Sequence, residues 1–455
     1  KALSLIFDSS AKKRLEVHDF NKQILLEDLK ESPPKISIAI TISQSKDGDI
    51  MPDDLATVSY WLTRLREPYE AQLTYEYFLP TKEYDRYKKM VSEVTEVKEI
   101  WRIIDEEFIR LYIYKIWGGK LINQTPADSE SMQRFDFQFL DAIRDVERDM
   151  LTGKNTLLKN VLDFFMDYDI KSDSGKTEEQ KIAEIKKKKN EFAEDADILL
   201  KNLECRMEKG KEQILSYASD IGASFDKSNP NFEGSITDVE LYSALKLIVE
   251  YSDGVKIPIS HNGLGYNNLI FISLLLSKMQ INTDGKYLGS NAKVFPILAI
   301  EEPEAHLHPT MQYQFLKFLD KNMKQNKVRQ IFITTHSTHI VASIPLDKII
   351  CLYKINNKVS VAYPGKALTD EKSKKYVQRF LDATKSDMLF AEKVILVEGI
   401  TEQLLLSLFA QYEGYSLEEN HVTVINIGGR YFKPFLSLFD TSHPHTIDRK
   451  VACLT

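Results

Sequence analysis

The sequence predicts an α/β fold in which buried strands end in acidic residues. Two continuous apolar segments, 294–300 and 331–333, are bounded by polar residues. This pattern is typical of strands that are covered on both faces, as in parallel α/β sheets. A third apolar segment, 394–397, also runs into a glutamate and predicts a second, smaller α/β unit. Between residues 171 and 215 the pattern is instead that of a long amphipathic helix, so we expect a helical insertion in the first unit.

Composition narrows the class of protein. The 455 residues suggest two or three domains, and 43% apolar with 28% charged residues is ordinary for a folded chain. No segment approaches the ~18 apolar residues of a spanning helix, and we find no signal peptide. Three scattered cysteines fit a reducing cytoplasm and no zinc spacing. A net charge of −7 excludes a generally basic nucleic-acid binder. We therefore expect a cytoplasmic protein without a membrane partner, whose DNA contacts come from a local patch or a metal site.

Both ends of the sequence have the pattern of an element's interior. The chain begins with Lys1 rather than methionine, and residues 1–7 resemble the middle of a helix. Residues 450–455 have the composition of a buried strand. We therefore expect the chain to be part of a longer protein, with further motifs beyond both ends.

Alternation with a period of two marks the strands of the first part. Isoleucines occupy every second position from 36 to 42, which predicts a strand with one buried face. The expected elements up to residue 165 are a helical segment at 1–30, strands at 36–42, 73–77 and 134–140, a helical stretch from 81 to about 117 that ends at Gly118-Gly119, and helical spacing at 141–165. The later ones are helices at 269–278, 371–384 and 402–410, a hairpin of 349–354 with 359–362, and strands at 294–300, 331–333, 394–397, 422–427 and 450–455.

The helical insertion has one apolar stripe. Apolar residues recur at steps of three or four from Ile182 to Met207, which predicts one long helix, as in a coiled-coil arm. The basic run Lys186–Lys189 lies within it. The simpler interpretation of such a run is a solvated helix face, and the alternative is a DNA-binding patch.

Two adjacent acids follow the first buried strand. Glu301 and Glu302 lie at its carboxyl end, where α/β folds place their ligands. Successive residues point in different directions, so one carboxylate can hold Mg²⁺ while the other orients a water for attack on a γ-phosphate. The simpler alternative is an acidic turn that caps the next helix.

Two further segments strengthen the phosphate interpretation. His336 ends the next buried strand and can hydrogen-bond a γ-phosphate or the attacking water. Residues 260–268 form a glycine-rich turn before an apolar helix, and free amides at a helix start suit a phosphate. Taken alone, the histidine fits a structural role and the glycines fit a simple turn.

The order of these segments resembles the second half of an ABC-type ATPase head. In that resemblance Ser260–Asn267 is the signature loop, Glu301-Glu302 the Walker B acids, Ala305–Pro309 the D-loop and His336 the switch histidine. The run Glu301-Glu302-Pro303-Glu304-Ala305-His306-Leu307-His308-Pro309 is similar to the OLD (overcoming lysogenisation defect) family. We interpret its two histidines as loop-packing and dimer-contact residues rather than metal ligands, and Pro309 as the start of a helix.

The sequence departs from the ABC pattern at two points. No Gly-x-x-x-x-Gly-Lys-Ser/Thr phosphate loop occurs in it. In the OLD family the phosphate loop precedes a sequence similar to residues 2–8, so we expect the phosphate loop just upstream of Lys1. Glu301 also occupies a position where many ABC proteins have aspartate, although a carboxylate is kept.

The segment 390–402 resembles the start of a Toprim domain, as found in topoisomerases, primases and OLD nucleases. Glu398 ends an apolar strand before a glycine, and Glu402 lies four residues on, so one helical turn can place both near one metal. Residues 426–432 fit the next Toprim-like turn. In that fold a later strand ends in Asp-x-Asp, and 450–455 is similar to that strand.

The resemblance implies the following organisation. We expect the first part of an ABC-type ATPase head at 1–165, a helical or coiled-coil insertion that can act as a dimerisation arm at 166–235, the second part of the head at 236–365, a linker helix at 366–388, and a truncated Toprim α/β domain at 389–455.

The resemblance also implies an ATP-hydrolysing, metal-dependent DNA endonuclease. Glu301 would hold Mg²⁺, Glu302 would polarise the water, and His336 would sense the γ-phosphate. The signature-loop residues would close on ATP held by another subunit, which requires a homodimer or a higher homo-oligomer. These loop residues are Ser260, Asn262, Gly263 and Gly265. Glu398 and Glu402 would ligate Mg²⁺ or Mn²⁺ for cleavage. Such proteins often serve anti-phage defence beside a helicase, as in Gabija-type systems, or a reverse transcriptase with its non-coding RNA, as in some retrons.

Two other classes of function stay open at this point. One is an ABC-type DNA-repair or scaffold ATPase whose Toprim fold binds nucleic acid without cutting it. The other is a topoisomerase- or primase-like enzyme, although we see neither a nucleophilic-tyrosine domain nor a zinc-binding domain. Acids in the expected Asp-x-Asp segment would favour the nuclease over the scaffold.

Overall fold

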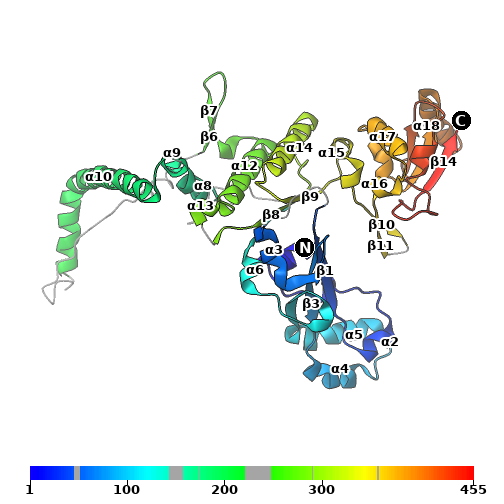
Figure 1. Cartoon of the computed structure of the whole chain (residues 1–455), viewed down its shortest axis with the longest axis horizontal. Helices are drawn as coiled ribbons and strands as arrows, with labels where there is room; N and C mark the ends of the chain where they lie inside the picture. Colours follow the sequence, from blue (N-terminus) through cyan, green and yellow to red (C-terminus); the bar gives the residue numbers. More distant parts are fainter. Residues whose placement is uncertain (46–51, 143–156, 174, 221–246, 289–290, 356–357) are drawn as a thin grey trace. The chain divides into compact units, whose positions relative to one another are not determined.

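The computed structural model describes residues 1–45, 52–142, 157–173, 175–220, 247–288, 291–355 and 358–455. The chain divides into two compact units, and Figure 1 shows their elements. The first unit combines residues 1–143 with 290–455, and the second contains residues 144–289. Among the described residues, no helix has the length and apolar character needed to cross a membrane.

An antiparallel sheet forms much of the first hydrophobic core. Strand β3 (Glu70–Phe78) lies between β1 (Ile36–Ser43) on one side and β2 (Leu62–Arg64) with β4 (Ile113–Gly118) on the other. In β1 partly buried and exposed residues alternate, as its period of two predicts, because only one face is covered. In β3 six of the nine residues are buried, and Leu73 and Tyr75 are fully enclosed.

A parallel sheet brings Glu301, Glu302 and His336 to one edge. Its order is β5 (Phe135–Leu140), β8 (Phe295–Glu301), β9 (Gln330–Thr334), and all three strands are parallel. Phe7 of α1 (Ala2–Phe7) stacks on Phe135, with ring centroids 4.7 Å apart. Because β8 lies in the centre, residues 296–300 are buried, and the predicted continuous apolar strand is confirmed. The carboxyl ends of β8 and β9 lie level, with Glu301 opposite Thr334.

A second hydrophobic core joins the later elements of the same unit. The hairpin of β10 (Cys351–Ile355) and β11 (Lys358–Ala362) and the helix α17 (Glu371–Phe380) contribute to it. A parallel sheet with the order β13 (Val422–Asn426), β12 (Lys393–Val397), β14 (Lys450–Leu454) completes it. Helix α18 (Ile400–Tyr412) follows β12 directly. The predicted hairpin, connecting helix and second α/β unit are thus confirmed. The expectation that 450–455 is a buried strand is wrong, because β14 lies at the edge of its sheet and four of its five residues are exposed.

The second unit is built around two long helices. Helix α12 (Leu264–Asn282) contacts α8 (Leu157–Phe165), and the short hairpin β6 (Ile248–Glu250)–β7 (Lys256–Pro258) precedes α12. Helix α10 (Glu178–Asp220) confirms the predicted long helix of the insertion.

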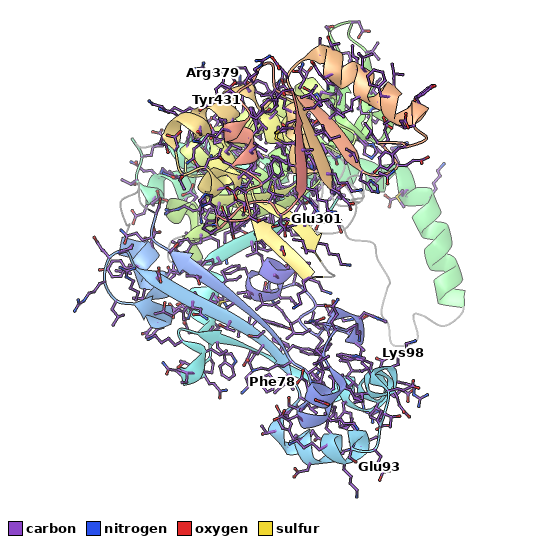
Figure 2. The ribbon with its side chains drawn as sticks, turned by 90° about the vertical axis from the view of Figure 1, so that its right-hand side faces the viewer. Phe78, Glu93, Lys98, Glu301, Arg379 and Tyr431 are labelled. Atoms are coloured by element: carbon purple, nitrogen blue, oxygen red, sulfur yellow. The ribbon has the colours of Figure 1, made fainter. Side chains whose placement is uncertain are left out.

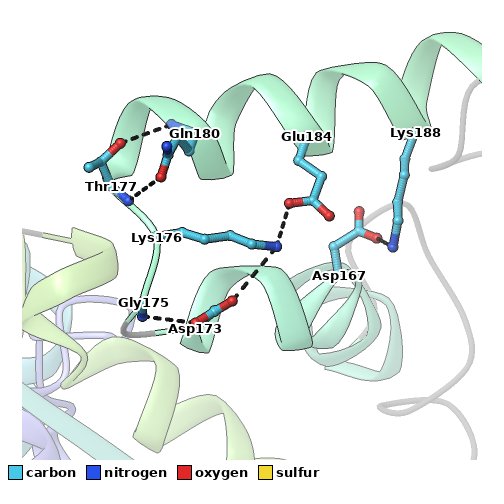
Figure 3. Close-up of polar contacts among 8 residues, drawn as sticks. All are labelled: Asp167, Asp173, Gly175, Lys176, Thr177, Gln180, Glu184 and Lys188. Carbon is cyan, nitrogen blue, oxygen red and sulfur yellow. Dashed lines mark hydrogen bonds and ion pairs between the residues drawn. The ribbon is translucent and has the colours of Figure 1, made fainter.

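Reciprocal hydrogen bonds and ion pairs fix the start of α10 (Figure 3). The amide of Gln180 donates to Thr177 Oγ1 at 3.3 Å, and the amide of Thr177 donates to Gln180 Oε1 at 3.0 Å, which satisfies two orphan donors of the helix end. Lys176 Nζ bonds Glu184 at 2.6 Å. Lys188 pairs with Asp167, which precedes α9 (Tyr168–Ser172), at 3.3 Å. Lys187 pairs with Glu191 at 3.7 Å, so two lysines of the basic run make ion pairs within the unit. DNA contact by the run stays a prediction.

The remaining helices are short, apart from one that follows β8. They are α2 (Leu26–Glu31), α3 (Pro52–Val58), α4 (Tyr84–Val91), α5 (Val97–Ile103), α6 (Ser129–Gln133), α13 (Gly285–Leu288), α14 (Pro309–Lys324), α15 (Thr338–Ala342), α16 (Pro364–Ala367) and α19 (Lys433–Leu436).

Two expected helical segments are wrong. Residues 1–30 contain α1, a 3-10 turn at Val17–Asp19 and the start of α2, with irregular chain between them. Residues 113–118 form the strand β4 instead of a helix end, because pairing with β3 satisfies their backbone. Trp117 Nε1 there donates to the buried Glu76 at 2.9 Å. Of the expected helical spacing at 141–165, residues 143–156 lie outside the described chain and 157–165 are helical.

Gly118→Ala is expected to destabilise the first core. A Cβ at this position would lie 2.3 Å from Cδ1 of Trp61, whose side chain is fully buried and cannot yield easily. Overpacking of this kind costs about 1–3 kcal/mol in the free energy of unfolding. The matched control is Gly210→Ala in α10, where no atom lies within 4 Å and helix propensity improves by up to ~1 kcal/mol. Thermal melts of both variants check this; a Gly118→Ala protein that melts like the wild type would contradict the packing around Trp61.

Candidate functional site

The end of β8 places Glu301 and Glu302 at the edge of the parallel sheet, and Glu301 is labelled in Figure 2. The amide of Glu302 donates to the carbonyl of Thr334 at 2.9 Å, which ties the end of β8 to the end of β9. Glu302 has a φ of 41°, a left-handed conformation that is uncommon outside glycine and is found at functional sites. The chain therefore turns sharply at Glu302, so the two acids are presented differently.

The structure brings Glu302 and His336 together. Glu302 Oε1 lies 3.6 Å from His336 Nε2. Both side chains are accessible, with 45% and 83% of their areas exposed, respectively. A carboxylate facing an imidazole at the carboxyl ends of two parallel strands can orient a water and hold a proton between them. Their roles in hydrolysis remain predictions.

Glu304 is a site residue that the sequence reasoning missed. Its Oε1 accepts hydrogen bonds from Thr335 Oγ1 and from the amide of His336, each at 2.7 Å. Its Oε2 is buried and has no hydrogen-bond partner among the described residues. The sequence feature that could have indicated Glu304 is its position as a third acid in the same segment, directly after Pro303.

Further hydrogen bonds hold the loop after β9 against helix α14. The amide of Ser337 donates to Thr335 Oγ1 at 2.9 Å, and Ser337 Oγ donates to Gln312 Oε1 at 2.6 Å. Gln312 is buried, and its Nε2 donates to the carbonyl of Leu307 at 3.0 Å. The loops that follow β8 and β9 are therefore one connected polar network.

The histidines of the loop after β8 have separate surroundings. Pro309 begins α14, as predicted, and His308 caps this helix by accepting the amide of Thr310 at its Nδ1, 3.3 Å away. His306 is exposed and has a φ of 64°. The local role of His308 agrees with its interpretation as a loop-packing residue; the dimer contact stays a prediction.

The predicted signature loop belongs to the second unit. Gly263 is the N-cap of α12, which places Gly265 in the first helical turn, and Ser260 lies in a 3-10 turn at Ile259–His261. A Cβ on Gly263 would meet no atom of the described residues within 4 Å. The predicted roles of these residues toward ATP stay predictions.

Two asparagines hold the signature loop in shape. Tyr251 Oη donates to Asn262 Oδ1 at 2.8 Å, and Asn262 Nδ2 donates to the carbonyl of Pro258 at 3.2 Å. Both ends of the Asn262 amide thus bond residues that precede the loop. Asn267, which the sequence reasoning did not single out, is buried, and its Nδ2 donates to the carbonyl of Ile259 at 2.9 Å.

The second acidic edge lies after β12. Glu398 follows this strand, and both its carboxylate oxygens lie 3.1 Å from Arg430 Nε. Arg430 belongs to the loop after β13, where Gly428 and Gly429 have φ values of 75° and 149°. The amide of Gly429 donates to the carbonyl of Glu398 at 2.9 Å. These bonds fix the edge between the two neighbouring strands.

Glu402 lies close to the same turn. A Cβ added to Gly399 would come within 3.0 Å of Glu402 Oε2, so the carboxylate lies over the glycine in the first turn of α18. Strand β14 runs parallel to β12 with Leu454 opposite Val397, which directs its end to the same edge.

The donor set at both edges consists of carboxylate oxygens, the ligands that Mg²⁺ and Mn²⁺ prefer. Within the described part of the chain, no three histidine, cysteine, aspartate or glutamate side chains are placed together as a metal-binding group. Metal binding by Glu398 and Glu402 at one edge and by Glu301 at the other stays a prediction.

Comparison with known proteins identifies both parts of the chain. Residues 2–341 match the family described as "AAA ATPase domain". Residues 389–455 match "Overcoming lysogenization defect protein-like, TOPRIM domain". The predicted α/β fold, an ATPase domain followed by a Toprim domain, is thereby confirmed.

Three curated relatives are nucleases by name. The "Endonuclease GajA" of Bacillus cereus (strain HuB5-5) is 27% identical over 45% of this chain and 33% of that protein. The "OLD nuclease" of Thermus scotoductus is 27% identical over 49% of this chain and 38% of that protein. The "Old nuclease" of Escherichia phage P2 is 24% identical over 38% of this chain and 29% of that protein. The matched region thus spans about a third of each relative. By sequence and architecture, the chain belongs to the AAA ATPase domain family and continues into a Toprim domain of the OLD type.

Proposed function

We propose that the complete protein is an ATP-hydrolysing, metal-dependent DNA endonuclease of the OLD family. The observation that supports this most strongly is the presence of two separate acidic strand ends in one chain. Glu301 and Glu302 follow β8 in the ATPase domain, and Glu398 follows β12 in the Toprim domain. The names of the relatives GajA and OLD nuclease favour cleavage over binding alone.

At the ATPase edge the acids have different tasks. Glu301 would help to hold Mg²⁺, which when bound neutralises phosphate charge. Glu302 orients the attacking water and accepts its proton, and His336, 3.6 Å from Glu302, faces the γ-phosphate. The left-handed turn at Glu302 supports this division, because it separates the directions of neighbouring side chains.

At the Toprim edge Glu398 and Glu402 would hold Mg²⁺ or Mn²⁺, which when bound activates water and stabilises the leaving oxygen of the cut strand. Arg430 partners both oxygens of Glu398 in this structure. A divalent cation would replace it as the partner of that carboxylate. The exposed guanidinium, with 81% of its side chain accessible, is free to move aside.

The partners follow from the same proposal. DNA is the substrate, and the ATPase domain works as a homodimer or a higher homo-oligomer. Similarity to the Old nuclease of Escherichia phage P2 supports a role in conflict between phage and bacterium. We therefore place the protein in cytoplasmic anti-phage defence, beside a helicase or a reverse transcriptase with its non-coding RNA.

The test of this function is cleavage of supercoiled plasmid by the purified full-length protein. We expect nicked and linear products with Mg²⁺ or Mn²⁺ and none with EDTA, while ATP hydrolysis is measured on the same preparation. A protein that hydrolyses ATP and binds DNA but cuts with neither metal is instead a scaffold ATPase.

A mixing experiment tests assembly through the signature loop. Gly265 lies in the first turn of α12, so Gly265→Arg places a long cation in the loop predicted to close on a partner's ATP. Gly265→Arg and Glu302→Gln should each hydrolyse ATP poorly alone. Mixed dimers should regain activity, because one of the two composite sites then has an intact loop and an intact base.

The controls are each variant mixed with itself, which should stay inactive. Light scattering on the same samples reports the oligomeric state. A fully active monomer, or mixtures no more active than their components, would contradict the shared-site arrangement.

A further inference from the structure

Glu304 connects two loops whose site residues are far apart in the sequence. We propose that Glu304 is a positioning residue for ATP hydrolysis, whose Oε1 fixes the main chain of His336 and thereby keeps the imidazole facing Glu302. This inference rests on the roles proposed above for Glu302 and His336, and it assigns a separate task to the third acid of the segment.

One oxygen of Glu304 holds the loop after β9 by two hydrogen bonds. Glu304 Oε1 accepts the amide of His336 and the hydroxyl of Thr335, both at 2.7 Å. Bonds of this length to a carboxylate are charge-assisted and stronger than neutral ones. The peptide plane before His336 cannot rotate without breaking the first bond, and the second bond fixes the preceding side chain.

The imidazole has little other support. His336 is 83% exposed, and its 3.6 Å contact with Glu302 joins two accessible groups. Ion pairs between exposed groups hold their geometry weakly. The direction of His336 must therefore come from its main chain. Glu302 is held in a similar way, since its amide bonds the carbonyl of Thr334. Glu302 is thus anchored to the end of β9, and His336 is anchored to the loop after β8.

The second oxygen of Glu304 argues against a purely stabilising role. Oε2 is buried and has no hydrogen-bond partner among the described residues, an arrangement that costs free energy of folding. An amide at this position would remove the buried charge and still present an acceptor at Oε1. If Oε2 instead ligates a cation or carries out chemistry, an amide would not replace it.

Two substitutions of opposite character separate these roles. Glu304→Gln keeps the length and the acceptor but removes the charge, whereas Glu304→Asp keeps the charge and shortens the reach. A positioning role predicts that Glu304→Gln keeps kcat for ATP within about threefold of wild type, because an amide carbonyl still accepts both bonds. Glu304→Asp should lower kcat by roughly 10- to 100-fold with little change in KM, as misplaced groups do.

A double-mutant cycle with His336→Ala tests whether Glu304 acts through the histidine. Once the imidazole is absent, Glu304→Asp should lower kcat by less than about twofold further, because both changes remove the same contribution. A residue that only supports folding would lower activity in both backgrounds, and melting curves of all variants report that loss directly.

The outcomes separate this inference from the proposed function. If Glu302→Gln and His336→Ala both impair hydrolysis while Glu304→Asp matches wild type, the ATPase site stands and the role of Glu304 is wrong. A Glu304→Gln variant as slow as Glu304→Asp, or effects that multiply in the double variant, would also overturn it. If Glu302→Gln and His336→Ala both hydrolyse ATP normally, the proposed site itself fails, and with it any positioning role for Glu304.

Discussion

Glu302→Gln should bind ATP but hydrolyse it at least about 10²-fold more slowly than the wild-type protein, as expected when a general base is removed. Glutamine keeps the size of the side chain and most of its hydrogen bonding, and the backbone bond to Thr334 is unaffected. The side chain is 45% exposed, so folding should change little. The measurement is steady-state ATP turnover of the full-length protein beside a nucleotide-binding titration.

A matched control for Glu302 is Glu106→Gln. Glu106 lies in a helical segment at 104–108, in the part of the chain that precedes the parallel sheet, and it is exposed. This variant should turn over ATP like the wild type. If Glu302→Gln does the same, Glu302 is not the base and the acidic turn is structural.

Glu398→Gln should abolish metal-dependent cleavage of plasmid DNA while leaving ATP hydrolysis nearly intact. An amide binds Mg²⁺ or Mn²⁺ more weakly than a carboxylate and weakens the hold of the metal on the scissile phosphate. The two activities should separate because the ATPase acids follow β8 in another domain. Glu402→Gln should reduce cleavage less if its ligation is secondary.

Arg430→Gln is the control for the ion pair that Glu398 makes. It removes the contact of Arg430 with both oxygens but keeps the Glu398 carboxylate. An exposed pair of this kind contributes only about 0–1 kcal/mol to stability. Arg430→Gln should therefore melt like Glu398→Gln and still cut DNA. Equal loss of cleavage in both variants would assign Glu398 to the ion pair rather than to a metal.

The sequence predicts the acidic strand ends because their patterns are local. A buried parallel strand needs a continuous apolar run, and the residue after it is fixed at the sheet edge, so β8 and β12 and the acids at their ends could be located. β9 was located as well, but the expectation that both its faces are buried is wrong, because partly buried and exposed residues alternate along it. The contact between Glu302 and His336 was not predicted; it follows from the pairing of β8 with β9 in the structure. The left-handed turn at Glu302 could not be expected from residue type.

Interactions between distant segments are what the sequence does not reveal. The strand β4 was wrongly expected to be helical. Its pairing with β3 depends on residues about 40 positions away, which a local pattern does not include. The task of Glu304 depends on two donors more than 30 positions downstream, and nothing in the residues nearby announces them. Hydrogen bonds of this kind are set by tertiary packing, which periodicity does not encode.

The central claim is that one protein carries both an ATPase and a nuclease site, and Glu398→Gln in the full-length protein tests it most directly. Plasmid nicking with titrated Mg²⁺ or Mn²⁺, ATP turnover and a melting curve should be recorded on one preparation. The account predicts no cleavage at any metal concentration, with normal melting and near-normal ATP turnover. A variant that melts normally and cuts DNA at the wild-type rate would contradict it, and the Toprim domain would then be a binding module on a scaffold ATPase.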